Sequence, residues 1–183
     1  MALSDHIQVF DSQSASYKHA FQMFLDHTDQ KRNAKRWLEQ VVDTLPSRRV
    51  FIDAGAGNGE VTRALTGAFD RTIAIEPNAY LLQQLREAAP LAELIADPIL
   101  EAQPPAQGDL VLCSHVLYYI RPEEWLAHLE RLVSWMAPSG VTIVILQNRD
   151  TGCMNMLHHF FNHRFELCHV AELLRQKHGD RYE

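Results

Sequence analysis

The sequence predicts an α/β protein with a doubly wound, mostly parallel sheet preceded by helices. From residue 50 onward, short β-branched runs alternate with stretches of helical periodicity, the pattern of strands connected by helices. Before residue 47, apolar residues recur at helical spacing. The length of 183 residues, 46% of them hydrophobic, suits one domain. We expect a single domain over residues 1–183, with an N-terminal helical cap over 1–46 and a core over 47–183.

The cap is expected to hold two amphipathic helices, because apolar residues recur at i, i+3, i+4 and i+7. Pro46 ends the second helix. The two expected apolar faces are Tyr17, Ala20, Phe21, Phe24 and Leu25, and Trp37, Leu38, Val41, Val42 and Leu45.

The core is expected to alternate five strands with helices. Pro122, followed by Glu123 and Glu124, suits the first turn of a helix. The predicted strands are Val50–Ala54, Thr72–Glu76, Glu93–Ala96, Leu110–Ser114 and Val141–Gln147. The predicted helices are Glu60–Phe69, Ala79–Ala89, Pro122–Met136 and Val170–Lys177, and residues 102–108 are predicted as a loop.

Composition argues against several classes of protein. The net charge is −6 and no run of five like charges occurs, which is unfavourable for nucleic-acid binding. No apolar run is long enough to span a bilayer, and the first residues lack a signal-peptide pattern. Three cysteines without framework spacing indicate a reduced, cytoplasmic protein. His159 and His163 have the i, i+4 spacing of metal ligands, but no acidic ligand accompanies them, so we expect no metal site.

A glycine-rich turn between the first strand and the next helix carries the strongest chemical signal. Glycines there let the backbone turn tightly and approach a ligand. Gly55 and Gly57 fit the dinucleotide fingerprint G-x-G-x-x-G, but Glu60 occupies its third position. A carboxylate beside the helix N-terminus would also repel a pyrophosphate. Both points weigh against an NAD-dependent oxidoreductase.

The pattern D-x-G-x-G-x-G over Asp53–Gly59 resembles motif I of the class I S-adenosylmethionine-dependent methyltransferases. The resemblance implies a Rossmann-like sheet and S-adenosylmethionine as cofactor. Glu76 ends the second predicted strand, where a carboxylate can accept hydrogen bonds from both ribose hydroxyls. Asp97 follows the third strand, where these enzymes often reach the adenine amino group. The expected cofactor-binding residues are Asp53, Gly55, Ala56, Gly57, Gly59, Glu76, Pro77, Asp97 and Ser114.

Two further segments are similar to histamine N-methyltransferase and its bacterial relatives. They are the Tyr-x-x-x-Phe-x-x-Phe-Leu-x-His run beginning at Tyr17 and the Leu-Tyr-Tyr run ending at Tyr119. The resemblance implies a small amine as acceptor. Two positions depart from the family: Gln30 replaces its amine-binding glutamate, and His115 replaces its glutamine. The expected substrate-binding residues are Tyr17, Phe21, Gln30, His115, Tyr118 and Tyr119, although the face with Tyr17 and Phe21 could equally be core.

Methyl transfer from a sulfonium is an in-line displacement, so the protein mainly aligns the reactants. His115 is the candidate catalytic base for an acceptor that arrives protonated. The alternative is a histidine that only hydrogen-bonds a neighbour or the substrate. At the level of the whole chain, the alternative to an enzyme is a methyltransferase-like assembly module that binds the cofactor or has lost it.

The family's sheet usually has seven strands, and this sequence leaves room for five. Val141–Leu146 reads as a buried strand, yet it would lie at an edge if strands six and seven are missing. A long apolar edge favours pairing with another chain. We expect either a chain truncated from a longer protein or a partner that completes the sheet, and in both cases association such as a homodimer through the fifth strand.

Overall fold

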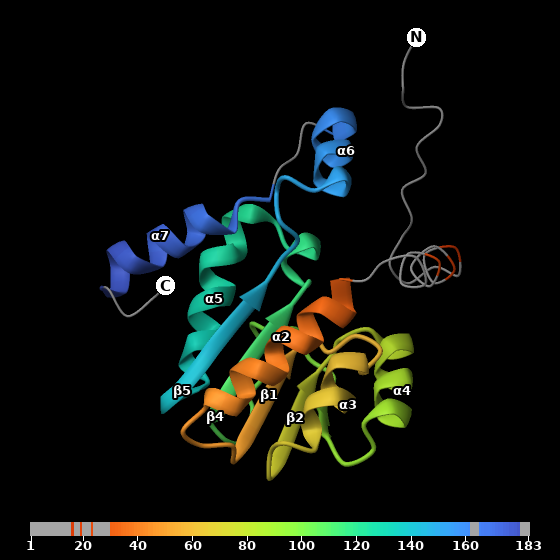
Figure 1. The fold of residues 1–183 in the computed structure, drawn as a ribbon, viewed down its shortest axis with the longest axis vertical. Helices are drawn as coiled ribbons and strands as arrows, with labels where there is room; N and C mark the ends of the chain where they lie inside the picture. Colours follow the sequence, from red (N-terminus) through yellow and green to blue (C-terminus); the bar gives the residue numbers. More distant parts are fainter. Residues whose placement is uncertain (1–15, 17–18, 20–22, 24–29, 162–164, 180–183) are drawn as a thin grey trace.

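The computed structural model describes residues 16, 19, 23, 30–161 and 165–179. Its elements alternate along the chain as the β-branched and helical stretches of the sequence do (Figure 1). The helices are α2 (Gln30–Thr44), α3 (Glu60–Thr66), α4 (Ala79–Ala88), α5 (Trp125–Ser134), α6 (Gly152–Phe161) and α7 (Leu167–His178), with 3-10 turns η2 (Leu117–Tyr119) and η3 (Pro122–Glu124). The strands are β1 (Val50–Ala54), β2 (Arg71–Ile75), β3 (Glu93–Ile95), β4 (Gly108–Ser114) and β5 (Met136–Ile145).

The five described strands form one sheet in the order β3-β2-β1-β4-β5, and every neighbouring pair is parallel. The chain passes from β1 outward to β2 and β3, then returns to the other side of β1 through β4. The strand order therefore reverses between β1 and β4. In doubly wound sheets, ligands bind outside the carboxyl ends of the strands at such a reversal. The fold thus confirms the predicted doubly wound architecture. It also indicates where a ligand site is expected, at the carboxyl ends of β1 and β4.

Alternation along each strand places two apolar layers against the sheet. On one face, Phe51 of β1 and Leu110 of β4 pack with Leu38 of α2 and Leu65 of α3. On the same face, Ala74 of β2 packs with Leu85 of α4. Residues of α2, α3 and α4 therefore cover this side.

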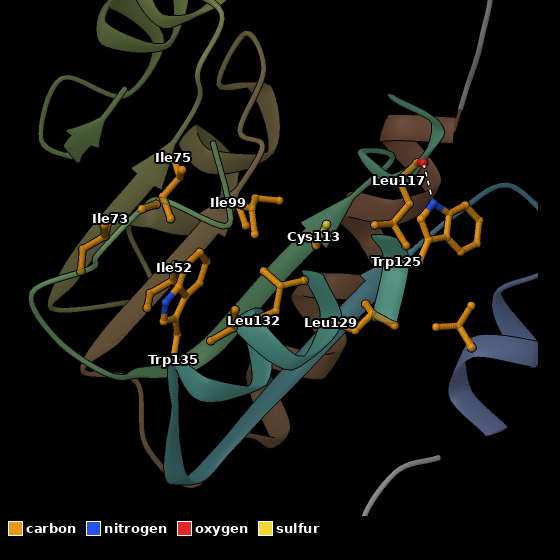
Figure 2. Packing of buried hydrophobic residues seen from close by; sticks show 14 of the residues in the cluster. Ile52, Ile73, Ile75, Ile99, Cys113, Leu117, Trp125, Leu129, Leu132 and Trp135 are labelled. Carbon is orange, nitrogen blue, oxygen red and sulfur yellow. Dashed lines mark hydrogen bonds between the residues drawn. The ribbon is translucent and has the colours of Figure 1, made fainter. Parts of the chain in front are cut away.

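The opposite face carries the larger core, in which α5 packs against the strands (Figure 2). Trp125, Leu129 and Leu132 of α5 are buried there, at the i, i+4 and i+7 spacing of one helical face. The chain passes from β3 to β4 without a helix. The loop that connects these two strands contributes Ile99 and Ala102 to this core instead. Burial of these side chains fixes α5 and the loop against β1, β2 and β4.

Several predicted bounds need correction. The helix predicted over Pro122–Met136 is a 3-10 turn followed by α5, which ends at Ser134, and Met136 already belongs to β5. The reason is a register shift in the ladder: Gly108 of β4 pairs with Met136 before the regular pairing resumes between Leu110 and Val141. The irregular start of β5 has no β-branched run, so the predicted strand Val141–Gln147 begins only at the regular part, and it also runs two residues past the observed end at Ile145.

β5 lies at an edge of the described sheet and pairs there with β4. Its side chains are mostly half-buried or exposed, and Val141 is exposed. It is therefore an edge strand and not a buried central one, because β4 is its only partner among the described strands. Association of two chains through this edge stays a prediction. Among the described residues, no helix is long and apolar enough to cross a membrane.

Candidate active site

The glycine-rich turn begins where β1 ends and leads into α3. Gly55, Gly57 and Gly59 all have positive φ, at 77°, 58° and 80°. Side chains rarely adopt this backbone region, which explains the repeated glycines. A Cβ on Gly55 would lie 2.3 Å from Val116 Cγ2, whereas a Cβ on Gly57 would meet nothing within 4 Å. The turn is therefore packed against the chain after β4 at its first glycine and open at its second.

The backbone holds this turn to the next strand. The Gly55 and Ala56 N–H groups both donate to the Ile75 carbonyl oxygen of β2, at 2.8 and 3.0 Å. Glu76 directly follows β2, and its Oε2 accepts from the Gly57 N–H at 2.9 Å. Its Oε1 accepts from the Asn78 N–H at 2.8 Å. The structure thus brings the glycine turn and Glu76 together, as the strand-end positions predicted.

Glu76 is only 6% exposed. Burial raises the pKa of its carboxyl, and the hydrogen bonds from Asn78 and Gly57 lower it in part. Asn78 in turn caps α4, since its Oδ1 accepts from the Tyr80 and Leu81 N–H groups. A buried carboxylate with a raised pKa at a strand end is a typical feature of functional sites.

Asp53 lies inside β1 and is almost fully buried. Its Oδ2 accepts from Thr62 Oγ1 of α3 at 2.6 Å. Asp53 therefore also fixes α3 to the strand, a structural role that the motif alone did not reveal. Cys113 of β4 lies close enough to Asp53 to feel its charge. The pKa of the Cys113 thiol is raised to about 12, mainly because the thiol is buried and to a smaller extent because of the Asp53 charge.

The end of β4 forms the other half of the site. His115 follows Ser114 and has φ 59°, which makes it a non-glycine residue in the left-handed region. Its N–H donates to the Ile145 carbonyl oxygen of β5 at 2.8 Å, so the backbone remains in the ladder up to this residue. Such strain costs about 1–3 kcal/mol and gathers at functional sites.

His115 contacts Tyr118 of η2. The two rings stack with centroids 5.9 Å apart, and His115 Nδ1 lies 3.3 Å from Tyr118 Oη. Tyr118 Oη also accepts a hydrogen bond from the Gln147 N–H, beyond the end of β5. Tyr118 therefore connects the ends of β4 and β5.

A buried aromatic group holds η2 in place. Trp125 Nε1 donates to the Leu117 and Ile120 carbonyl oxygens at 3.1 and 3.0 Å, and Figure 2 shows the first of these bonds. Phe165 stacks on Trp125 and meets Tyr118 edge-on. Tyr119 is 62% exposed, so of the two neighbouring tyrosines only Tyr118 packs inward, against His115 and Phe165.

The remaining predicted residues are less closely joined to this group. Pro77 and Asp97 are exposed beyond the ends of β2 and β3, and Gln30 is the first residue of α2. Tyr17 and Phe21 lie outside the described residues, as does His163. In the described part of the chain, no group of three His, Cys, Asp or Glu residues could hold a metal ion.

Sequence reasoning missed four residues that shape the site. Thr62 donates a hydrogen bond to Asp53, and the Asn78 N–H donates one to Glu76. Val116 packs against Gly55, and the Gln147 N–H donates to Tyr118. Asn78 was accessible to prediction, because an Asn directly before a helical stretch is a common N-cap. The Val116 and Gln147 contacts join segments far apart in the sequence. The bond from Thr62 to Asp53 spans nine residues and passes from α3 to β1, so it follows from tertiary packing and not from a local pattern.

Comparisons with known proteins agree with this arrangement. A family model described as a methyltransferase domain matches residues 25–183. Trans-aconitate 2-methyltransferases from two strains of Rhodopseudomonas palustris, BisB5 and BisB18, are 28% and 29% identical over 125 residues. These 125 residues are 67% of this chain and 48% of each relative, so the chain spans about half the length of the curated relatives it matches.

Solved structures with low sequence identity share the fold. The N-methyltransferase NodS from Bradyrhizobium japonicum WM9 is 15% identical and superposes with a TM-score of 0.67, over 81% of this chain and 84% of that one. The complex of DhpI with SAM and HEP is 22% identical with a TM-score of 0.61, over 85% and 72% of the two chains. The amino pentose methyltransferase CalS10 from Micromonospora echinaspora, bound to SAM, is 18% identical with a TM-score of 0.60, over 76% and 58%.

These comparisons confirm the superfamily resemblance and the fold, whereas the similarity to histamine N-methyltransferase stays a hypothesis. With most of its length matched by the family model, and with the glycine turn and sheet order described above, the chain belongs to the class I S-adenosylmethionine-dependent methyltransferases.

Proposed function

We infer that this chain transfers a methyl group from S-adenosylmethionine to a small molecule at the carboxyl ends of β1, β2 and β4. The observation that carries this is the open glycine turn tied to a buried carboxylate: a side chain on Gly57 would meet nothing within 4 Å, and the Gly57 N–H is bound to Glu76. Such a turn leaves room for a ligand chain that carries no phosphate, and the carboxylate offers acceptor oxygens for hydroxyl groups.

The cofactor supplies a methyl group bound to a positively charged sulfur. We assign its ribose hydroxyls to Glu76, its ammonium group to Asp53 and its adenine to Asp97. The rest of the proposed cofactor contacts come from residues of the turn and the neighbouring strand ends: Gly55, Ala56, Gly57, Gly59, Pro77 and Ser114. These residues orient the cofactor, and the protein's main contribution to rate is alignment of the acceptor with the methyl–sulfur bond.

The acceptor is proposed to lie beside the end of β4, near His115, Tyr118 and Tyr119. Tyr17, Phe21 and Gln30 complete the proposed substrate-binding set. An amine acceptor is what the proposed resemblance to histamine N-methyltransferase implies, and aromatic faces attract cations. A carboxylic acid is the second candidate, because the curated relatives are trans-aconitate 2-methyltransferases.

Calorimetric titration with S-adenosylhomocysteine tests this proposal, with NADH as the control ligand. We expect one binding site for S-adenosylhomocysteine and no heat from NADH. Binding of NADH alone would contradict the assignment of the glycine turn. Binding of neither ligand would favour the alternative of an assembly module that has lost the cofactor.

A further inference from the structure

The hydroxyl of Tyr118 has two neighbours with different chemistry. The Gln147 N–H is a backbone donor and cannot accept, so the Tyr118 oxygen is the acceptor in that bond. His115 Nδ1, at 3.3 Å, can accept when it carries no proton. With its oxygen accepting from Gln147, the phenol still has its own proton to donate, and His115 Nδ1 is an acceptor at hydrogen-bond distance.

We propose that Tyr118 is a positioning residue that holds neutral His115 with its proton on Nε2. A neutral imidazole carries one proton, so an unprotonated Nδ1 requires a protonated Nε2. His115 then donates a hydrogen bond to the substrate and does not remove a proton from it. This selects the second of the two roles that the sequence left open for His115.

The fold keeps this arrangement in place at a conformational cost. His115 has φ 59° while its N–H stays bonded to β5. Trp125 fixes η2 through two hydrogen bonds, and Phe165 packs edge-on against Tyr118. A strained residue held from both sides by β5 and η2 is the pattern expected where a side chain must keep one orientation.

The donor role selects the acceptor class, a step that rests on the proposed function. An Nε2–H facing an amine would bind the lone pair that must attack the methyl group. A carboxylate has two oxygens: one forms the new bond to carbon while the other accepts from Nε2–H. The methyl–sulfur bond breaks, its electron pair stays on sulfur, and a neutral methyl ester and neutral thioether result. No proton moves in this step, so no base is needed.

Ring-nitrogen NMR of ¹⁵N-histidine-labelled protein tests the proton position, at a pH where His115 is neutral. The His115 signals are assigned by their loss in His115→Gln. We expect a protonated Nε2 and an unprotonated Nδ1, and a shift toward the other tautomer in Tyr118→Phe. Tyr119→Phe is the matched control and should leave the tautomer unchanged. A protonated Nδ1 in the unmodified protein would overturn the proposal even if Tyr118→Phe fails to fold.

Transfer of tritiated methyl groups tests the acceptor class, with trans-aconitate and histamine as probes together with a panel of mono-, di- and tricarboxylates. Alkali releases an ester methyl as volatile methanol and leaves an N-methyl group in place. We expect alkali-labile product from a carboxylate, and a kcat about tenfold lower in Tyr118→Phe, the size of one lost hydrogen bond, with an unchanged KM for S-adenosylmethionine.

Label found only in histamine, or no transfer to any carboxylate by a chain that binds S-adenosylhomocysteine, would overturn the carboxylate assignment. The tautomer measurement needs no methyl donor. A chain that fails to bind S-adenosylhomocysteine would therefore contradict the proposed function, while the NMR result would still decide the role of Tyr118.

Discussion

The two ends of the central strands hold buried carboxylates in opposite electrostatic conditions. At the amino end of β4, Asp109 accepts from the Arg49 and Val50 N–H groups at 2.8 and 3.0 Å and from the Arg49 guanidinium at 3.3 Å. Burial acts to raise the pKa of Asp109, but these hydrogen bonds outweigh it and the pKa lies below its usual value. At the carboxyl end of β2, burial dominates and the pKa of Glu76 is raised.

Backbone strain separates the two ends in the same way. Within the described residues, the positive-φ positions other than Gly179 are the three glycines of the turn and His115, all at the carboxyl ends of β1 and β4. At the amino end, the carboxylate of Asp109 has hydrogen-bond partners that stabilise its charge. The carboxyl end holds the strained backbone conformations and the buried carboxylate of Glu76, whose charge is unfavourable. Because such costs persist where function requires them, the comparison supports the proposed placement of the site at the carboxyl end.

The largest expected effect comes from Gly55→Ala. Its Cβ would lie 2.3 Å from Val116 Cγ2 in a backbone region unfavourable to alanine. We expect the free energy of unfolding to fall by about 3 kcal/mol, from the left-handed conformation and the overpacking together. Gly57→Ala shares the positive φ without a clash, so it should lose only the conformational part. Equal losses in chemical denaturation would show that the turn is not packed against Val116.

Asp109→Asn should be the next most damaging change. It removes the charge from a carboxylate that is 2% exposed and bonded to two backbone N–H groups. We expect a loss of about 2 kcal/mol in urea denaturation. Arg49→Met is the matched control: this side chain is 69% exposed, so its removal should cost less than about 1 kcal/mol. A larger loss from Arg49→Met would mean that the guanidinium, and not the two backbone N–H groups, is the main stabilising partner of Asp109.

The pH dependence of stability should differ in sign at the two ends. Folding raises the pKa of Glu76 above 4.5, so its contribution to the free energy of unfolding falls as pH rises through the raised pKa. Folding lowers the pKa of Asp109 below 3.8, so its contribution is present above that value and is lost as pH falls through the lowered pKa.

Urea denaturation across this acidic range measures both contributions. Glu76→Gln should be increasingly stable relative to the unmodified protein as pH rises, and Asp109→Asn should be increasingly unstable. The same sign for both variants would contradict the contrast between the two ends.

The smallest expected change in stability comes from His115→Gly. Glycine adopts φ 59° without strain, but the stacking on Tyr118 is lost. We expect thermal unfolding to report a gain of about 0.5 kcal/mol, because the relief of left-handed strain slightly exceeds the lost contact. Methyl-transfer turnover should fall in the same variant. A loss of stability with full turnover would mean that His115 serves the fold.

The carboxyl-end turn could be predicted because its function depends on the backbone. Positive φ demands glycine, and glycine spacing is visible in the sequence, so Gly55, Gly57 and Gly59 were found with the bounds of β1 correct. Glu76 followed from its position after an apolar strand. Its tie to Gly57 could not be predicted, because that bond joins two loops through tertiary packing.

The proposed acceptor half of the site depends on side chains from several elements, which no local pattern brings together. Tyr118 meets Gln147 and Phe165 only because η2, β5 and the segment before α7 converge. The partner of Asp109, Arg49, lies 60 residues away in the sequence, so the anchoring role of Asp109 stayed hidden. Tyr17 and Phe21 remain predictions.

Titration of Glu76→Gln and Asp109→Asn with S-adenosylhomocysteine, side by side at a temperature where both are folded, tests the central claim most directly. Glu76→Gln keeps the side-chain size but loses a charged acceptor, so affinity should fall by about 10- to 100-fold. Asp109→Asn should bind like the unmodified chain, since Asp109 lies at the opposite end of the sheet. Unchanged affinity in Glu76→Gln, or a comparable loss in Asp109→Asn, would contradict the placement of the cofactor at the carboxyl end.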